Sequence, residues 1–254
     1  PVLETRGVHQ WFPGVHALRG VDVRLFPGEV HALMGENGAG KSTLIKVLTG
    51  VYHADAGTVL LDGAPVRFAG PAQAQRAGVS TVYQEVTLAP TLSVAENICI
   101  GREPRRFGAI QWKKLRARAT QLLERLQLDL DVTAPLGSYS LAIQQLVAIV
   151  RAVDISSKVL ILDEPTSSLD ADEVEQLFTV VRQLRRDGIA ILFITHFIDQ
   201  VYEISDRMTI LRNGALVGEC RTHELLRIDL VQAMIGKELS TLADLKNKVH
   251  SSER

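Results

Sequence analysis

Residues 35–43, Gly-Glu-Asn-Gly-Ala-Gly-Lys-Ser-Thr, constrain this chain more than any other stretch. They fit the P-loop pattern Gly-x-x-x-x-Gly-Lys-Ser, in which glycines let backbone N–H groups curl around a phosphate without a Cβ in the way. A helix that begins near Lys41 would present its positive end to the same anion. Lys41 would then reach the β- and γ-phosphates of a nucleotide, and the Ser42 hydroxyl would ligate Mg²⁺. The predicted nucleotide-binding residues of this loop are Gly35, Glu36, Asn37, Gly38, Ala39, Gly40, Lys41, Ser42 and Thr43.

The flanks of the loop support this interpretation over a chance match. A Gly-rich turn would fit the pattern by accident in about one random chain of this length in a hundred. Residues 29–34 form an apolar run that is typical of a buried strand, and four apolar residues within 44–48 have the spacing of a helix face. Strand, loop and helix therefore follow one another in the order that a nucleotide site requires.

Chain length and net charge restrict the possible folds and partners only broadly. The 254 residues can form one large α/β domain or two small ones. The net charge is −1, with 28 basic and 29 acidic residues, which gives no electrostatic footprint for nucleic acid. Cys99 and Cys220 are isolated and indicate small buried hydrophobes in a reducing cytoplasm. Because no apolar run approaches the ~18 residues of a membrane span, we expect a soluble chain that could dock onto a membrane partner.

A second strand predicts a metal site. Residues 159–162 are four consecutive apolar residues, which indicates a strand covered on both faces, and Asp163 and Glu164 follow directly. Two carboxylates at the end of such a strand are costly unless a cation or a water molecule needs them. We therefore favour a metal and water site over a purely structural role.

Two further strands end in polar residues. Residues 79–83 lead to Gln84, and residues 189–195 lead to His196. Ligands of open α/β sheets bind at the carboxyl ends of the strands, so Gln84 could reach Mg²⁺ or the attacking water. A single Gln is weak evidence, and a lone His is usually structural, but His196 at a third strand end favours a phosphate contact.

Three other segments shape the expected domain. Residues 2–34 are β-rich and predict antiparallel strands that feed the P-loop strand. The aromatic pair Trp11 and Phe12 lies there beside a turn; either a packing role or stacking on adenine is open, and position favours Phe12 for stacking. The loop 101–108 has three arginines around a proline and a phenylalanine; a surface loop is the default, and a docking surface is the alternative.

Together, the P-loop, Gln84, the run Asp-Glu-Pro-Thr-Ser-Ser-Leu-Asp at 163–170 and Thr195-His196 resemble the ATP-binding cassette (ABC) transporter ATPases along nearly the whole chain. Within that family, residues 34–44, 82–85 and 100–104 are similar to the carbohydrate importers. The resemblance implies an α/β P-loop NTPase fold, with a mostly parallel sheet core, an antiparallel β subdomain and an inserted helical subdomain. We expect the domain over residues 1–240, its core at 1–84 and 155–240, its helical insertion at 85–154, and a polar tail at 241–254.

The resemblance also implies roles for the residues. Phe12 corresponds to the aromatic that stacks on adenine, and Gln84 to the sensor of Mg²⁺ and water. Asp163 would hold Mg²⁺, and Glu164 would be the general base on the water. His196 would contact the γ-phosphate.

The implied activity is ATP hydrolysis coupled to uptake of a sugar of the galactofuranose, ribose and galactose class. The implied partners are membrane subunits, a sugar-binding protein acting indirectly, and a second cassette, at the cytoplasmic face of the cell membrane. No nucleic acid is expected.

The chain departs from the family in two ways. The signature Leu-Ser-Gly-Gly-Gln corresponds here to residues 139–143, Tyr-Ser-Leu-Ala-Ile, so Ser140 is kept as a nucleotide-binding residue and both glycines are replaced. The importers also usually carry two cassettes in one chain, whereas this sequence stops after the first. It is either a truncated protein or a half-length subunit.

Two other classes remain as alternatives: an ABC ATPase of DNA repair or translation, and a non-catalytic nucleotide-binding module. Repair relatives insert long coiled coils, but the 99 residues between Lys41 and Ser140 have no sustained heptads. The near-neutral charge disfavours nucleic acid. Loss of Glu164 would indicate a binding module, and Glu164 is present.

Overall fold

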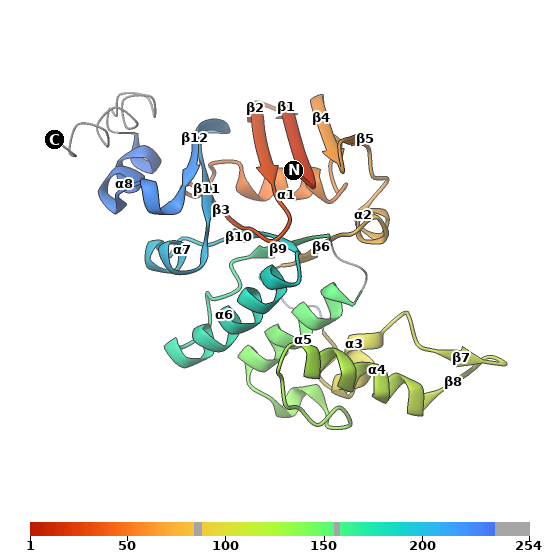
Figure 1. The fold of residues 1–254 in the computed structure, drawn as a ribbon. Coiled ribbons are helices and arrows are strands. Elements are labelled where there is room, and N and C mark those ends of the chain that lie inside the picture. Colours follow the sequence, from red (N-terminus) through yellow and green to blue (C-terminus); the bar gives the residue numbers. More distant parts are fainter. Residues whose placement is uncertain (84–87, 155–157, 237–254) are drawn as a thin grey trace.

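The computed structural model describes residues 1–83, 88–154 and 158–236 (Figure 1). Gln84 and the tail at 241–254 lie outside these residues. The described part contains a six-stranded sheet in the order β12-β11-β3-β10-β9-β6, a four-stranded sheet in the order β2-β1-β4-β5, and a small hairpin, β7-β8. None of its helices is long and apolar enough to cross a membrane.

The six-stranded sheet is mostly parallel, as predicted. The pairs β6/β9, β9/β10, β10/β3 and β3/β11 are parallel, and β11 and β12 form an antiparallel hairpin. All residues of β3 and β10 are buried, which is the pattern of strands covered on both faces. Its strands are β3 (Val30–Met34), β6 (Val79–Val82), β9 (Val159–Asp163), β10 (Ala190–Ile194), β11 (Arg207–Arg212) and β12 (Ala215–Arg221).

The antiparallel strands predicted ahead of the P-loop strand form the second sheet. Buried and solvent-facing residues alternate along much of β1 and β2, because one face of this sheet packs on the core. From β2 the chain turns at Pro27-Gly28 and enters β3 in the other sheet. The strands of this sheet are β1 (Leu3–Phe12), β2 (Val15–Leu25), β4 (Ala56–Leu61) and β5 (Ala64–Val66).

The helices lie on both sides of the main sheet, and α3, α4 and α5 form a group of their own between β6 and β9 in the sequence (Figure 1). The predicted domain boundaries near residues 84 and 155 adjoin residues that the structure does not describe, so they stay predictions. The helices are α1 (Lys41–Leu48), α2 (Pro71–Ala77), α3 (Val94–Cys99), α4 (Trp112–Arg125), α5 (Leu141–Val153), α6 (Ala171–Arg186), α7 (Ile198–Ile204) and α8 (Arg227–Ile235).

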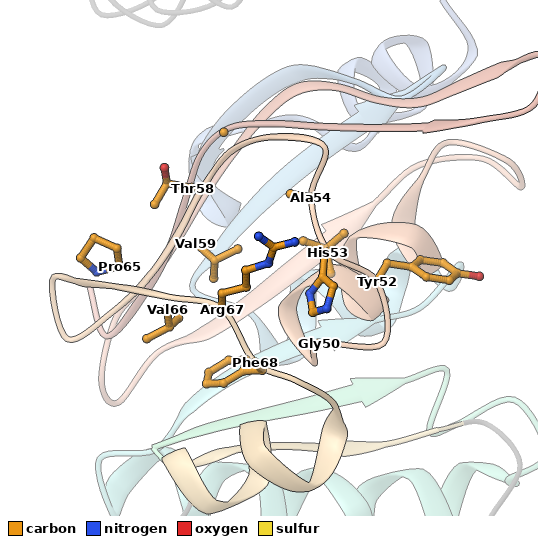
Figure 2. Close-up of a pocket in the computed structure, with 12 residues that line it drawn as sticks. Gly50, Tyr52, His53, Ala54, Thr58, Val59, Pro65, Val66, Arg67 and Phe68 are labelled. Atoms are coloured by element: carbon orange, nitrogen blue, oxygen red, sulfur yellow. The ribbon is translucent and has the colours of Figure 1, made fainter.

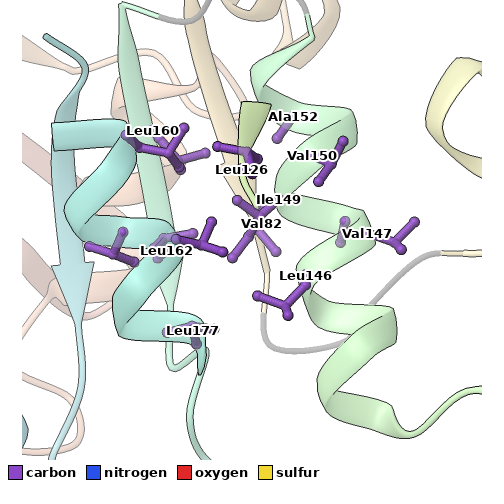
Figure 3. Packing of buried hydrophobic residues seen from close by; sticks show 14 of the residues in the cluster. Val82, Leu126, Leu146, Val147, Ile149, Val150, Ala152, Leu160, Leu162 and Leu177 are labelled. Carbon is purple, nitrogen blue, oxygen red and sulfur yellow. The ribbon is translucent and has the colours of Figure 1, made fainter. Parts of the chain in front are cut away.

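The two faces of strand β9 pack into two different hydrophobic clusters. Successive side chains of a strand point to opposite faces. Leu160 and Leu162 pack into a cluster with α5 and α6 (Figure 3), whereas Val159 and Ile161 pack into the cluster that contains α1 and the antiparallel sheet. The helical group is therefore fastened to the same strand whose end carries Asp163.

Local signals of the sequence are present in the structure. Ser93 and Glu96 form a capping box at the start of α3, and their hydrogen bonds lower the pKa of Glu96. Asn213 and Gly214 both have positive φ between β11 and β12, as a type I′ turn requires. The loop at 101–108 differs from the expected irregular segment, because it contains β7 (Arg105–Arg106) and leads into β8 (Ala109–Ile110).

Candidate functional site: a phosphate cleft between two sheets

At two positions of the P-loop only glycine fits, because a side chain would clash with neighbouring backbone atoms. Gly35 has φ 152°, and a Cβ there would lie 2.4 Å from the carbonyl oxygen of Leu211. Gly40 has φ 104° at the N-cap of α1, and a Cβ there would lie 2.8 Å from the carbonyl oxygen of Ala17. Any side chain at either position would push the loop away from β11 or β2. The loop is thus fitted between the two sheets before any ligand is considered.

Lys41 folds over its own loop. Its Nζ donates hydrogen bonds to the carbonyl oxygens of Gly35, at 2.6 Å, and Glu36, at 3.1 Å. Burial lowers the pKa of Lys41, and the nearby carboxylates of Glu164 and Asp163 oppose that shift. A phosphate in the loop would offer this amine a charged acceptor in place of two neutral carbonyls.

The P-loop forms one wall of a cleft of about 650 Å³. This cleft brings together segments far apart in the sequence: the ends of β1 and β2, the start of α1, the end of β9 and the β11–β12 turn. It is lined by Phe12, Val15, His16, Ala17, Arg19, Asn37, Gly38, Ala39, Gly40, Lys41, Ser42, Thr43, Asp163, Glu164, Asn213 and Gly214. The predicted residues 37–43, Asp163 and Glu164 therefore lie on one surface, whereas Gly35, Glu36 and His196 do not line it.

The turn at Asn213-Gly214 was not predicted as part of the site. The Gly214 N–H donates to the carbonyl oxygen of Ala39 at 3.0 Å, and the Gly214 carbonyl accepts from the Arg19 N–H at 2.7 Å. A Cβ on Gly214 would lie 2.5 Å from the carbonyl oxygen of Ala17. This glycine therefore joins the P-loop to β2, and the Asn-Gly signal of a hairpin also identified a residue of the cleft.

Asp163 and Glu164 end β9 inside the cleft. Burial raises the pKa of Asp163, the Glu164 carboxylate raises it further, and Lys41 and Lys46 lower it. A carboxylate held in this way lacks a full counter-charge within the protein. Oxygen donors of this kind, with the exposed hydroxyl of Ser42, suit a hard cation such as Mg²⁺.

Glu164 has an unusual backbone. Its φ is 49°, in the left-handed region that non-glycine residues rarely occupy, and its N–H donates to the carbonyl oxygen of Ile194 at 2.9 Å. Such a conformation costs on the order of 1 kcal/mol and persists where the surroundings hold it. The hydrogen bond to β10 stabilises this conformation and fixes the position of the Glu164 carboxylate at the end of β9.

His196 lies beside Glu164. Its Nδ1 is 3.5 Å from Glu164 Oε1, and its side chain is 54% exposed. It does not line the 650 Å³ cleft, so the structure brings His196 to the predicted base and not to the P-loop. Gln200, which the sequence reasoning missed, accepts hydrogen bonds from Thr195 (3.3 Å) and Thr166 (2.6 Å) and braces the two strand ends.

The two aromatic residues of β1 lie in different surroundings. Phe12 lines the cleft and meets the ring of Tyr52 edge-on, with centroids 5.2 Å apart. Trp11 is 46% exposed and stacks on His16 at 4.6 Å. Of these two aromatics, Phe12 lines the cleft and Trp11 does not, and stacking of Phe12 on adenine stays a prediction.

Ser140 lies elsewhere. It is the N-cap of α5, where its Oγ accepts a hydrogen bond from the Ile143 N–H at 3.4 Å. The next residue, Leu141, is 65% exposed. The start of α5 lines a separate pocket of about 220 Å³, which it shares with the segment after β9, including Glu164 and Ser167. Ser140 therefore does not reach the P-loop cleft of its own chain.

A further pocket of about 300 Å³ lies at the edge of the antiparallel sheet (Figure 2). Its walls include Val59, Phe68 and the side chains of His53 and Arg67. It shares no lining residue with the P-loop cleft. The predicted site does not extend to it. Gln84, the remaining predicted site residue, lies outside the described residues.

Comparisons with known proteins agree with this geometry. The family model described as "ABC transporter" matches residues 18–167. The galactofuranose transporter ATP-binding protein YtfR of Escherichia coli K12 is 57% identical over 95% of this chain and 48% of its own length. The fructose import ATP-binding protein FruK of Bifidobacterium longum is 54% identical over 98% of this chain and 48% of its own length.

Solved structures show the same fold. The ADP conformation of MJ1267, an ATP-binding cassette of an ABC transporter, is 27% identical with a TM-score of 0.80, and the match covers 93% of this chain and 99% of that one. The chain spans about half the length of the curated relatives it matches. The family match covers more than half of this chain and includes both the P-loop and the acidic end of β9. The chain therefore belongs to the ABC transporter family.

Proposed function

We propose that this chain binds and hydrolyses ATP to drive the uptake of a sugar through partner membrane subunits. One observation carries the proposal: the P-loop, Lys41 and the two carboxylates at the end of β9 line one cleft. The names of its relatives support the direction of transport, because they are import ATP-binding proteins for fructose and ribose and a galactofuranose transporter subunit.

The phosphates of ATP would lie in the P-loop, with Phe12 against the adenine. Mg²⁺ would be held by Asp163, the Ser42 hydroxyl and the nucleotide, with Gln84 as a further candidate. Few protein ligands suffice for Mg²⁺, which is usually bound by one or two carboxylates together with substrate phosphates. This agrees with the absence of any group of three or more His, Cys, Asp or Glu metal ligands in the described part of the chain. The ion would neutralise charge on the phosphates.

Glu164 would act as the general base. Its carboxylate would accept the proton of a water that attacks the γ-phosphorus, while the bond from that phosphorus to the leaving ADP oxygen breaks. His196, 3.5 Å from that carboxylate, would orient it and reach the γ-phosphate once the cleft is occupied. Phosphoryl transfer requires mainly positioning of the reacting groups and neutralisation of charge, and Lys41, Asp163 and Glu164 would supply both.

A second cassette would complete the site. The start of α5 does not line the P-loop cleft of its own chain, which supports a role for Ser140 at the nucleotide of a facing cassette. One solved relative, MJ0796, is described as a dimeric bacterial ABC transporter cassette, at 25% identity and a TM-score of 0.72. The partner here is a second copy or a second half of a longer protein.

The cargo is proposed only as a class. Relatives between 48% and 57% identical carry the names of galactofuranose, fructose and ribose transporters. We propose a sugar of the galactofuranose, ribose and galactose class, delivered by a sugar-binding protein, with the chain on the cytoplasmic face of the membrane. Glu164 in the cleft favours this function over a non-catalytic module, and the importer relatives favour it over DNA repair or translation.

Co-purification from native membranes tests the proposal. The tagged chain should bring down membrane subunits with spanning helices, and the complex should hydrolyse ATP faster when the sugar-loaded binding protein is added. A matched complex with Glu164→Gln should assemble but fail to respond. A chain that recovers only soluble partners, or a complex whose ATPase ignores every sugar of the class, would overturn the transport function.

A further inference from the structure

The β7–β8 hairpin exposes a large aromatic side chain at its tip. Phe107 is 96% exposed and has φ 50°, and Gly108 follows with φ 84°. The hairpin projects from the helical group at the edge of the molecule (Figure 1). The Phe107 ring therefore contributes almost nothing to the hydrophobic core and is available for contact with a surface outside the chain.

The base of the hairpin is firmly attached. Arg102 pairs with Asp154 and also donates to the carbonyl oxygen of Ile98 at 3.0 Å. The Gln111 N–H donates to the carbonyl oxygen of Pro104 at 2.7 Å, and Ile110 packs against the core cluster. These contacts fix the base of the hairpin, and the tip extends away from it.

The charge of this segment is opposite to that of the chain. Residues 100–116 contain six basic side chains and one acidic one, whereas the whole chain has a net charge of −1. The Arg106 guanidinium lies over the Phe107 ring, 5.3 Å from its centroid. Within the described residues, Arg106, Lys113 and Lys114 form no salt bridge, and Arg105 pairs only with Glu103. The cationic groups of the segment are thus largely free for an anionic surface.

We propose that the hairpin tip and the start of α4 bind the anionic headgroups of a lipid bilayer. The Arg and Lys side chains would pair with lipid phosphates, and Phe107 would enter the boundary between headgroups and acyl chains. A protein partner fits less well, because lysines are depleted from protein interfaces, whereas Lys113 and Lys114 are exposed at the start of α4 beside the hairpin. This contact goes beyond the proposed function, since it needs neither nucleotide nor membrane subunits.

Vesicle co-sedimentation of the nucleotide-free chain tests the contact. Binding should be strong to vesicles containing phosphatidylglycerol, weak to vesicles of phosphatidylcholine alone, and reduced by salt. The variant Arg105→Glu with Arg106→Glu should bind at least about 25-fold more weakly, because each basic residue near an anionic surface contributes about fivefold. Phe107→Ala should lose about fivefold, from the apolar area it no longer buries.

The matched control is Arg76→Glu with Arg186→Glu, which makes the same change in net charge on the exposed parts of α2 and α6. It should bind vesicles almost as well as the unaltered chain. Equal losses in the two double variants would mean that net charge, not the hairpin, sets binding. The proposal is overturned by that result, by absence of binding to anionic vesicles, or by a hairpin variant that keeps lipid binding and loses only the membrane subunits. None of these outcomes bears on ATP hydrolysis, which is measured separately.

Discussion

The P-loop cleft and the start of α5 are the two regions that we propose contact nucleotide, and they differ in how well their residues suit a phosphate. The P-loop has two glycines at which a Cβ would lie within 3 Å of a backbone oxygen, and the cleft is lined by a lysine and two carboxylates. The start of α5 has Ser140 as a capping residue, and an exposed Leu141 followed by a buried Ala142 where the family signature has glycines. A side chain at these positions keeps the backbone N–H groups away from a phosphate. We therefore expect this chain to bind nucleotide well in its own P-loop cleft and to contribute few donors to the nucleotide of a facing cassette.

The largest effect should come from the cleft. Glu164→Gln should reduce turnover by about 100-fold or more in the assembled complex and leave ATP affinity unchanged, because it removes a positioned base but no phosphate contact. Single-turnover hydrolysis and equilibrium nucleotide binding measure the two properties. Glu203→Gln on α7 is the control, and it should do nothing to either. If Glu164→Gln leaves turnover intact, the cleft is not the catalytic half.

The next effect should come from repairing the other half. Leu141→Gly with Ala142→Gly should raise ATP turnover of the isolated, self-paired chain by up to about 100-fold, since one donor to a transferring phosphoryl group can contribute that much. Leu141→Ala is the control, because it removes the large side chain without freeing the backbone. No gain in a chain confirmed to dimerise would show that the start of α5 is not what limits hydrolysis.

Removing the aromatic of the cleft should have a smaller effect. Phe12→Ala should weaken ATP binding about tenfold, within the range for loss of one stacked base. Trp11→Ala is the matched control, because Trp11 stacks on His16 and does not line the cleft. Titration with ATP and with inorganic triphosphate separates base from phosphate binding, and only ATP should respond. An equal response to both ligands, or a larger effect of Trp11→Ala, would assign the base to another surface.

The smallest expected effect distinguishes a capping role of Ser140 from a catalytic one. Ser140→Ala and Ser93→Ala should each lower the free energy of unfolding by about 1 kcal/mol, because each removes an N-cap oxygen. Only Ser140→Ala should also slow turnover of the self-paired chain. Chemical denaturation and steady-state ATPase assays provide the two readings. Turnover that falls equally in both variants would leave Ser140 with a structural role alone.

The sequence was informative where a feature depends on neighbours in the chain. The capping box at Ser93 and the positive-φ turn at Asn213-Gly214 are features of this kind, because each depends on only a few adjacent residues. The buried strands were also predictable, because strands covered on both faces are apolar throughout. The loop at 101–108 was harder, since two-residue strands leave no periodic pattern.

The sequence by itself determined that this chain has a phosphate loop and that acidic residues follow a buried strand, because the glycine spacing and the apolar run before the two carboxylates are local features. Only the tertiary structure decided which of them meet. Phe12, Asp163 and Gly214 line one cleft because β1, β9 and the β11–β12 turn come from different sheets and positions and converge there. Ser140 stays outside that cleft because α5 packs on the opposite side of β9 from α1. Pairing and packing between distant segments are set by the whole core, which no local pattern encodes.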